Sequence, residues 1–382
     1  MCHSRAKPEI LVGDMNILTE KKVPPWMEIV LEAVLFVFFL YCFLLSIQLM
    51  SKGFHYFGQG FAETLLRTTS NPVVGIFIGI LVTSVAQSSS LITSIVVGLV
   101  SGGLLSITNA IPIIMGSNIG TTVTNVIVSL GLIGNKEEFR RAFAGATMHD
   151  FFNIMTVIIL FPFQYYFNYL GWVSTNLTDL LGRIGGFKLA SPLQVMTDPP
   201  AEFLAGLLGH NIIIIMAFSL VMLFISLTLM VKYMKALIID KAEAIFERVI
   251  FRTKLQGMLF GLLLTATIQS SSVTTSLMVP LAGAGMLKLD RIFPYTMGAN
   301  IGTTVTAIMA ALALNNPLGI SAAFAHTIFN LTGVLIFWWL QFIPIGLAQG
   351  LSSLAYKNRA YAIIYVIVVF YAIPILMIWL FR

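Results

Sequence analysis

The chain has 382 residues, of which 58% are hydrophobic and 10% are charged, and its mean hydropathy is +0.92. This composition excludes a soluble globular protein and places the chain among membrane proteins. The net charge of +6 is carried by Lys and Arg residues dispersed at the ends of apolar stretches. That pattern favours contact with the anionic lipid of a bilayer and predicts no nucleic-acid partner.

Seven apolar stretches are long enough to cross a bilayer as helices. In chain order they cover about residues 26–50, 108–132, 139–168, 203–232, 290–314, 319–346 and 359–381. The polar residues 1–25 predict a cytoplasmic tail, and the stretch 26–50 is too long for the core of a signal peptide. We therefore expect an all-α polytopic membrane protein.

Two further apolar stretches, about 73–104 and 256–287, are each broken in the middle by Gln-Ser-Ser-Ser. Each is too long for one straight span, so each predicts two half-helices that meet at a polar tip, a re-entrant hairpin. With these hairpins placed, we expect the chain to divide into a first half at 26–168, an extracytoplasmic loop at 169–202, a second half at 203–347 and a C-terminal span within 348–382.

The basic residues predict the orientation of the chain. With the N-terminus inside, 17 of the 22 Lys and Arg residues fall on inner segments and five fall on outer segments. Because inner loops are enriched in Lys and Arg, this distribution favours a cytoplasmic N-terminus and an extracytoplasmic C-terminus.

The two halves of the chain repeat one another. A displacement of 182 residues aligns 75–127 with 257–309 without a gap, and 24 of these 53 positions are identical. GSNIGTTVT at 116–124 meets GANIGTTVT at 298–306, and HDFFN at 149–153 meets HTIFN at 326–330 after a five-residue shift. Three full crossings separate the hairpins, and an odd number predicts inverted-topology repeats, which indicate a secondary transporter.

The repeated motifs are rich in neutral oxygen donors, which suit a hard cation. A half-helix N-terminus at each hairpin break also presents backbone NH groups, which favour an anion. The candidate residues are Gln87, Ser88, Ser89, Ser90, Asn118, Thr121, Thr122, Thr124, Gln269, Ser270, Ser271, Ser272, Asn300, Thr303, Thr304 and Thr306. The alternatives are packing of small residues between membrane helices and a simple helix cap or kink at Asn-Ile-Gly-Thr-Thr.

Asp150 is an ionisable residue within an apolar span, and its counterpart in the second repeat is Thr327. Such a residue is a functional candidate by default, with an ion pair to Arg140 or Arg141 at the inner interface as the alternative. We expect His149 and His326 to make ordinary helix contacts, whereas Asn153 and Asn330 are open to either role. No catalytic set, phosphate loop or zinc-ligand spacing is present in the sequence, so we expect neither an enzyme nor a cofactor.

The paired QSSS motifs, IPIIMGSNIGTTVTN at 111–125, FRRAFAGATMHDFFN at 139–153 and GANIGTTVTA at 298–307 resemble the type II sodium-dependent phosphate cotransporters. The resemblance runs from about Asn71 to Leu340. The size of the chain and its short terminal segments resemble those of a bacterial member. The short segment 169–202 lacks the cysteines that animal members carry in a large outer loop, and those members have one more C-terminal span.

This resemblance implies uptake of inorganic phosphate driven by sodium across the plasma (inner) membrane. One implied sodium site comprises Gln269, Ser270, Ser271, Thr303 and Thr306, and the counterparts Gln87, Asn118, Thr121 and Asn300 extend the candidate set. The implied phosphate site comprises Ser88, Ser89, Ser270 and Ser271, extended to Ser90 and Ser272. The resemblance implies that Asp150 matches the aspartate that marks electrogenic members of the family. Asn153 matches a further proposed sodium-binding position. Val126, at a neighbouring position of that implied site, has no side-chain oxygen.

We therefore expect a sodium-phosphate symporter that works by alternating access in the lipid bilayer, with rocking and sliding motions both open. Another small oxyanion, such as sulfate or arsenate, is one alternative substrate. A gated ion pore is a second alternative, and a phosphate sensor without transport is a third. The sequence leaves the oligomeric state open, with a homodimer among the options.

Overall fold

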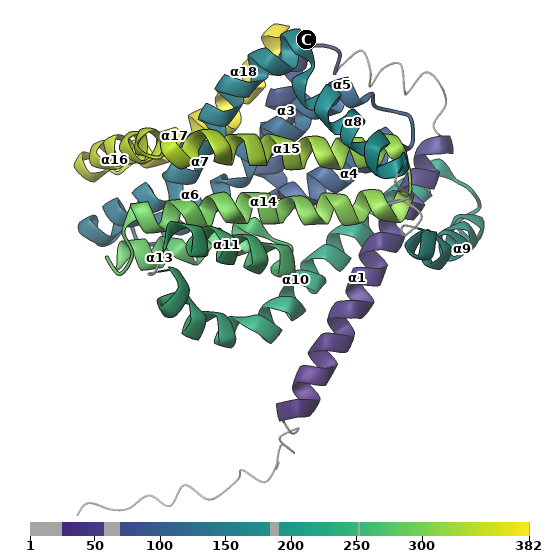
Figure 1. Ribbon diagram of the computed structural model, residues 1–382, viewed down its shortest axis with the longest axis horizontal. Helices are drawn as coiled ribbons and strands as arrows, with labels where there is room; N and C mark the ends of the chain where they lie inside the picture. The colour runs from purple at the N-terminus through teal and green to yellow at the C-terminus, as the bar shows by residue number, and fades with distance from the viewer. Residues whose placement is uncertain (1–24, 57–68, 184–190, 251–252, 382) are drawn as a thin grey trace, which may run out of the picture.

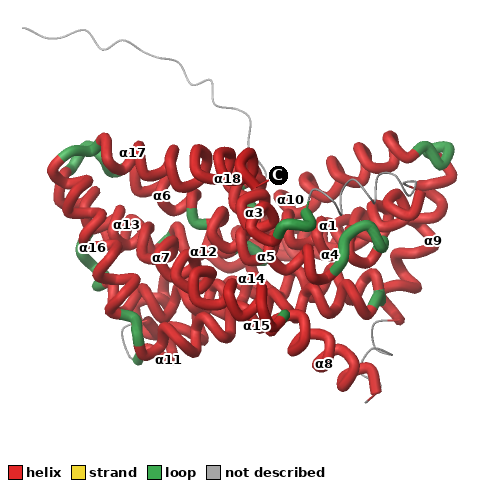
Figure 2. Tube along the Cα trace, turned by 90° about the horizontal axis from the view of Figure 1, so that it is seen from above, coloured by secondary structure: helices red, strands yellow, loops and turns green. Residues whose placement is uncertain are grey.

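The computed structural model describes residues 25–56, 69–183, 191–250 and 253–381, and the regular structure in these ranges is helical throughout (Figures 1 and 2). The predicted tail, apart from Pro25, lies outside the described residues. The helices up to the middle of the chain are α1 (Pro25–Tyr56), α3 (Pro72–Ala86), α4 (Ser89–Ser101), α5 (Ile107–Thr121), α6 (Val123–Leu130), α7 (Lys136–Phe167), α8 (Tyr169–Arg183) and α9 (Ser191–Leu207). Those that follow are α10 (Ile212–Ile250), α11 (Lys254–Ile268), α12 (Ser271–Ser276), α13 (Met278–Gly283), α14 (Leu289–Leu314), α15 (Pro317–Trp339), α16 (Phe342–Lys357), α17 (Ala360–Ile367), the π-helix η2 (Val368–Ala372) and α18 (Ile373–Phe381).

Seven segments within the described residues are long and apolar enough to cross a membrane. They are Met27–Met50, Ile107–Leu130, Lys136–Phe167, Ile212–Met230, Leu289–Leu314, Pro317–Trp339 and Ala360–Phe381. The all-α class is thereby confirmed, and the number of candidate spans equals the number predicted.

The fourth span begins at Ile212 and not at residue 203 as the hydropathy predicts. Gly209 and His210 have φ angles of +65° and +51°, a left-handed conformation that ends α9. The side chain of Asn211 then accepts hydrogen bonds from the backbone NH groups of Ile213 (3.1 Å) and Ile214 (3.2 Å) and caps α10. The Gly-His-Asn sequence therefore ends one helix and caps the next within this predominantly apolar stretch.

The sixth span ends at Trp339 and not at residue 346, and a separate helix, α16, follows it. Leu340 leaves the helical conformation, and Pro344 lies in the first turn of α16, where its missing NH group costs nothing. α16 packs along α7, and both lie in the left half of Figure 1.

The first arm of each Gln-Ser-Ser-Ser segment packs backbone to backbone against the next span of its own repeat. A Cβ atom on Gly79 would overlap the carbonyl oxygen of Ile113, and one on Gly116 would overlap that of Ile76. At the counterparts Gly261 and Gly298, an added Cβ atom would likewise overlap the carbonyl oxygens of Tyr295 and Met258. Small residues thus bring α3 against α5 and α11 against α14 at the closest possible distance, as in other membrane helix pairs.

The second arms cross to the opposite half. α4 packs against α14 and α15 of the second half, whereas α12 and α13 pack against α6 and α7 of the first half. The two Gln-Ser-Ser-Ser breaks therefore lie between the two halves of the chain.

An ion-paired cluster outside the apolar segments fixes α9 to α1. The Lys52 ammonium lies 3.0 Å from the Asp198 carboxylate and 2.6 Å from the Glu202 carboxylate. Hydrogen bonds from Gln48 and Lys52 lower the pKa of Asp198 below its ordinary value. Because both carboxylates are half exposed, we expect the cluster to contribute under about 1 kcal/mol per pair.

The glycine contacts predict a specific loss of stability. Gly298→Ala should lower the unfolding free energy by about 1–3 kcal/mol, because the new methyl group meets the carbonyl oxygen of Met258 on a neighbouring backbone. Gly350→Ala on α16 is the matched control, since a Cβ at that position meets no atom within 4 Å. Thermal unfolding of the purified variants in detergent measures both effects. Equal midpoints for the two variants would contradict the packing argument.

Candidate functional site

The two Gln-Ser-Ser-Ser motifs break their helices with the same backbone geometry. Gln87 ends α3 with φ +52°, and Gln269 ends α11 with φ +62°, both left-handed. Ser88 (φ −148°, ψ 102°) and Ser270 (φ −149°, ψ 105°) are extended N-caps of α4 and α12. Each serine hydroxyl accepts from a backbone NH group of the following turn, Leu91 at 3.2 Å and Val273 at 3.4 Å. The motif is therefore a helix break that supplies its own cap.

The two breaks meet inside the protein. The Ser90 hydroxyl of the first motif lies 3.3 Å from the Gln269 backbone oxygen of the second motif and 3.4 Å from the Thr306 hydroxyl. The Thr306 hydroxyl donates to the Gln269 side-chain oxygen at 2.7 Å. All three side chains are buried, at 4%, 5% and 0% exposure for Ser90, Gln269 and Thr306. Residues 179 positions apart thus form one neutral oxygen cluster, the tip cluster.

The first repeat does not form the equivalent contact. Gln87 is exposed, although its counterpart Gln269 is buried. Thr124 is the counterpart of Thr306, and its buried hydroxyl has no hydrogen-bond partner among the described residues. The second-repeat site is closed by its glutamine, whereas the first-repeat site keeps an unpaired hydroxyl.

Behind the tip cluster, histidines and asparagines of opposite halves bond to each other. The His149 Nε2 atom lies 2.8 Å from the Asn300 side-chain oxygen, and the His326 Nε2 atom lies 3.3 Å from the Asn118 side-chain oxygen. Each histidine of one repeat therefore pairs with the asparagine of the other. All four side chains are at most 4% exposed.

Two further asparagines complete this cluster, which we call the amide-histidine cluster. The Asn153 amide donates to the Asn118 backbone oxygen at 2.9 Å, and the Asn330 amide donates to the Asn300 backbone oxygen at 3.2 Å. The Asn300 amide in turn donates to the side-chain oxygens of Asn153 (2.7 Å) and Asn330 (3.3 Å). Buried amides are thereby satisfied mostly within each half, and the Asn300–Asn153 bond crosses the junction between the halves.

The cluster is not symmetric in detail. Asn125 bonds reciprocally to Thr275 of the second half (2.9 and 3.1 Å) and lies 3.3 Å from the His149 Nδ1 atom. Its counterpart is Ala307, which offers no side-chain hydrogen bond. The Nδ1 atom of His326 accordingly has no partner among the described residues.

Asp150 is fully buried on α7 and contacts the C-terminal helix. One carboxylate oxygen accepts from the Tyr365 hydroxyl at 3.0 Å, and the other has no hydrogen bond among the described residues. The alternative ion pair with Arg140 or Arg141 is not formed, because Arg140 pairs with Glu137 at 3.0 Å and Arg141 donates to the Gly283 backbone oxygen at 2.7 Å.

The structure brings some of the predicted site residues together in two clusters. Ser90, Gln269 and Thr306 come together in the tip cluster, and Ser270 adjoins it as the cap. Asn118, Asn153 and Asn300 belong to the amide-histidine cluster instead. Thr121 and Thr303 donate their hydroxyl protons to backbone oxygens one turn earlier, Ser117 and Ala299, both at 3.0 Å. Hydroxyls bonded in this way keep oxygen lone pairs for a cation.

Sequence reasoning missed the partners that lie far away in the chain. Asn125, Thr275 and Tyr365 have buried polar contacts with candidate residues, yet none was singled out. Asn125 directly follows the repeated GTTVT, which is the one signal that could have indicated it. Tyr365 lies in an apolar span with no motif around it.

We expect the threonine of the second repeat, Thr306, and its counterpart in the first repeat, Thr124, to respond differently to the same substitution. Thr306→Val removes the hydroxyl that donates to Gln269, and we expect it to lower the unfolding free energy by about 1–3 kcal/mol, since a buried acceptor is left unpaired. Thr124→Val removes a buried hydroxyl that has no partner in the described part of the chain, so stability should be unchanged or higher. Thermal unfolding in detergent compares the pair, and a larger loss at Thr124 would contradict this assignment.

Comparison with known proteins agrees with the motifs. The family described as Na+/Pi-cotransporter matches residues 42–189 and 222–377. Sodium-dependent phosphate transport protein 2A of Rattus norvegicus is 34% identical over an alignment of 418 positions. The alignment covers 88% of this chain and 65% of that protein. The corresponding protein 2A of Ovis aries is 33% identical (90% and 67%), and protein 2B of Homo sapiens is 31% identical (94% and 66%). The chain thus spans about two thirds of the length of these relatives, and no solved structure matches it. With more than half of its residues matched, this integral membrane protein belongs to the Na+/Pi-cotransporter family.

Proposed function

We propose that this chain is a symporter that couples sodium to the import of inorganic phosphate. The observation that carries the proposal is the meeting of the two Gln-Ser-Ser-Ser breaks in one buried cluster of neutral oxygens. Relatives that cover most of the chain are named as sodium-dependent phosphate transport proteins, which supports the choice of ion and substrate.

The topology in this proposal has two inverted repeats with re-entrant hairpins formed by α3–α4 and by α11–α13. The equal geometry of the breaks and the reciprocal packing of the second arms support it. The N-terminus is cytoplasmic and the C-terminus extracytoplasmic, following the charge distribution, and the membrane is a bacterial inner membrane. Alternating access then requires the cluster between the two hairpin tips to open to one side of the membrane at a time.

The sodium site of the second repeat is built from Gln269, Thr303 and Thr306, with Ser270 and Ser271 adjoining. The Thr303 and Thr306 hydroxyls lie one turn apart on α14 and are at most 2% exposed. Hydroxyl and amide oxygens of this kind replace the hydration shell of a hard cation. The side-chain oxygen of Gln269 accepts a hydrogen bond from Thr306 and therefore already points into the cluster. A bound cation would replace the Thr306 hydroxyl proton as the partner of this oxygen.

The phosphate site is formed by the serines of both motifs, Ser88 to Ser90 and Ser270 to Ser272. These side chains and the first-turn NH groups of the following helices are hydrogen-bond donors. No Lys or Arg lies between residues 73 and 104 or between 256 and 287. The charge of the anion is therefore balanced by co-bound sodium, which couples the two binding events.

Asp150 accounts for electrogenic transport in this proposal. Its unpaired carboxylate oxygen and the unpaired Thr124 hydroxyl both belong to the first half, whose glutamine Gln87 is exposed. A buried carboxylate is stabilised by a cation in the same low-dielectric site. We assign to this open half the further sodium ion that leaves the transported load with a net positive charge.

Uptake of labelled phosphate into proteoliposomes tests the function. An inward sodium gradient should drive phosphate above its equilibrium level, because a symporter concentrates its substrate. Gln269→Ala should abolish or sharply reduce uptake through the loss of a buried oxygen contact worth about 1–3 kcal/mol. Asn176→Ala changes an exposed amide on α8 and should leave uptake intact.

The same assay contains the outcomes that contradict the proposal. Phosphate that only equilibrates, at a rate independent of the sodium gradient, would indicate a gated pore. Sodium-driven accumulation of labelled sulfate in preference to phosphate would assign the chain to another oxyanion.

Asp150→Asn tests the assignment of charge movement. The amide keeps the size of the carboxyl group and an oxygen for Tyr365 but cannot neutralise an additional cation. We expect residual sodium-dependent uptake that no longer responds to an imposed inside-negative potential, which is worth about 2.3 kcal/mol per charge per 100 mV. Tyr365→Phe is the control, since it removes the hydroxyl contact and keeps the charge. A voltage response that persists in Asp150→Asn would overturn this role.

A further inference from the structure

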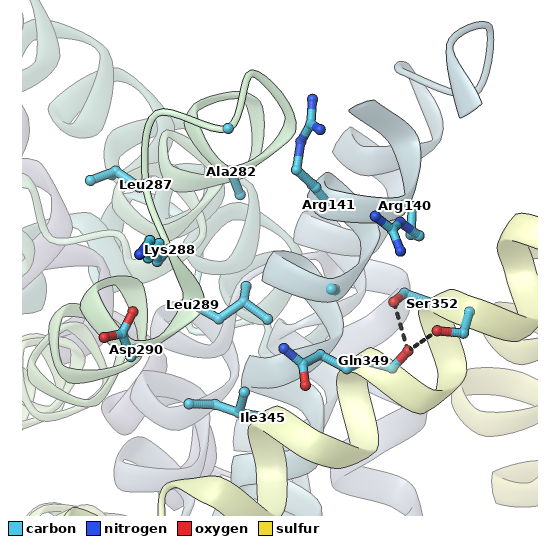
Figure 3. A pocket seen from close by; sticks show the side chains of 13 residues that line it. Arg140, Arg141, Ala282, Leu287, Lys288, Leu289, Asp290, Ile345, Gln349 and Ser352 are labelled. Carbon is cyan, nitrogen blue, oxygen red and sulfur yellow. Dashed lines mark hydrogen bonds between the residues drawn. The ribbon is translucent and has the colours of Figure 1, made fainter. Parts of the chain in front are cut away.

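A cavity of about 690 Å³ lies apart from the tip cluster, where the start of α7, the α13–α14 connection and α16 come together. Figure 3 shows Arg140 and Arg141 on one side of it, Lys288 and Asp290 on the other, and Gln349 of α16 along the lower edge. The basic residues fall on segments that the charge distribution predicts to be cytoplasmic.

The cationic groups of this cavity are held in different ways. Arg141 donates through Nε to the Gly283 backbone oxygen at 2.7 Å, which fixes its guanidinium beside the α13–α14 turn. Arg140 is shared with Glu137 at 3.0 Å. Lys288 is exposed, and it forms no salt bridge with a residue in the described part of the chain. Arg141 and Lys288 therefore keep donors for an anion, and among the described residues Asp290 is the one acidic residue that lines the cavity.

The remaining lining of the cavity is partly apolar. Leu287, Leu289, Ile345, Ala144 and Ala282 provide an apolar wall, whereas Gln349, Ser352 and Ser353 of α16 add uncharged polar groups. A small, fully hydrated ion gains no binding energy from apolar side chains. An amphiphile with an anionic head and an acyl chain uses both surfaces.

The exposed face of α16 indicates that the cavity borders the hydrocarbon. Phe342, Leu347 and Leu354 on this helix are 65%, 42% and 49% exposed. Because such side chains are stabilised by lipid and not by water, α16 is expected to lie in the membrane interface. A cavity beside it is open to lipid headgroups, and basic pockets between membrane helices on the cytoplasmic side are typical sites for acidic lipids.

We propose that this cavity binds the phosphate group of an anionic phospholipid, with the phosphodiester between Arg141 and Lys288 and an acyl chain along Leu289 and Ile345. Free inorganic phosphate shares this headgroup chemistry and is the second source that the experiment must separate. The proposal does not depend on transport, because the binding is measured without a sodium gradient.

The experiment uses the full chain purified in a neutral detergent, with native mass spectrometry and thermal unfolding as readouts. Phosphatidylglycerol should remain bound and raise the unfolding midpoint, whereas phosphatidylcholine and inorganic phosphate should not do so through this cavity. Lys288→Gln should weaken phosphatidylglycerol binding at least fivefold, and Arg141→Gln should do the same if it folds. Lys254→Gln removes one positive charge from the same predicted face outside the cavity and should leave binding unchanged.

Lys288→Gln carries the test, since Lys288 is exposed and its side chain makes no cap hydrogen bond to α14. Equal binding of phosphatidylglycerol by Lys288→Gln and wild type would overturn the proposal. A stabilisation by inorganic phosphate that is lost in Lys288→Gln, with no retention of phosphatidylglycerol, would overturn the lipid assignment and identify the free anion. Failure of uptake with lipid binding intact would concern the proposed transport function alone.

Discussion

The structure depends on one constraint, which is that a helix broken inside an apolar environment must find partners for the backbone groups released by the break. Ser88 and Ser270 supply these partners locally by capping the helices that follow them. Gln87 and Gln269 turn the chain in the left-handed conformation. The close glycine contacts then hold each first arm against its own repeat, and the second arm is left to cross to the other half. The location of the tip cluster follows from these local solutions.

The two halves share a backbone plan and differ at side chains near the breaks, although the residues of the tip cluster have identical counterparts in the two repeats. Pro280 interrupts the second hairpin into α12 and α13, because it cannot donate a backbone hydrogen bond, whereas its counterpart Gly98 lies within a continuous α4. Thr265 bonds to Thr274 at 2.7 Å, but the buried Thr83 hydroxyl has no described partner, since Ile92 stands at the position equivalent to Thr274. The repeat therefore explains the shared architecture, and these two departures explain the split of the second arm and the Thr83 hydroxyl without a partner among the described residues.

The sequence was sufficient to predict the class, the number of spans and the positions of both breaks, because those features are local. Apolar length, a capping serine and a repeated motif act within a few residues. The pairing of His149 with Asn300, the contact of Tyr365 with Asp150 and the separation of α16 from α15 were not predicted. The first two join residues more than 150 positions apart, for which periodicity has no signal, and the third is set by the conformation of a single residue, Leu340.

The kinds of contact at the junction also indicate how the two halves could separate in the proposed transport cycle. Within a repeat, α3–α5 and α11–α14 are joined by backbone contacts at glycine that leave no room to slide. Between the repeats, the described contacts at the tips and in the amide-histidine cluster are hydrogen bonds among hydroxyl, amide and imidazole groups. A neutral hydrogen bond contributes about 1 kcal/mol net when water or an ion can replace it. The junction is therefore the interface at which a bound ion can compensate for lost contacts, so motion of the rigid helix pairs as units is favoured over deformation within them.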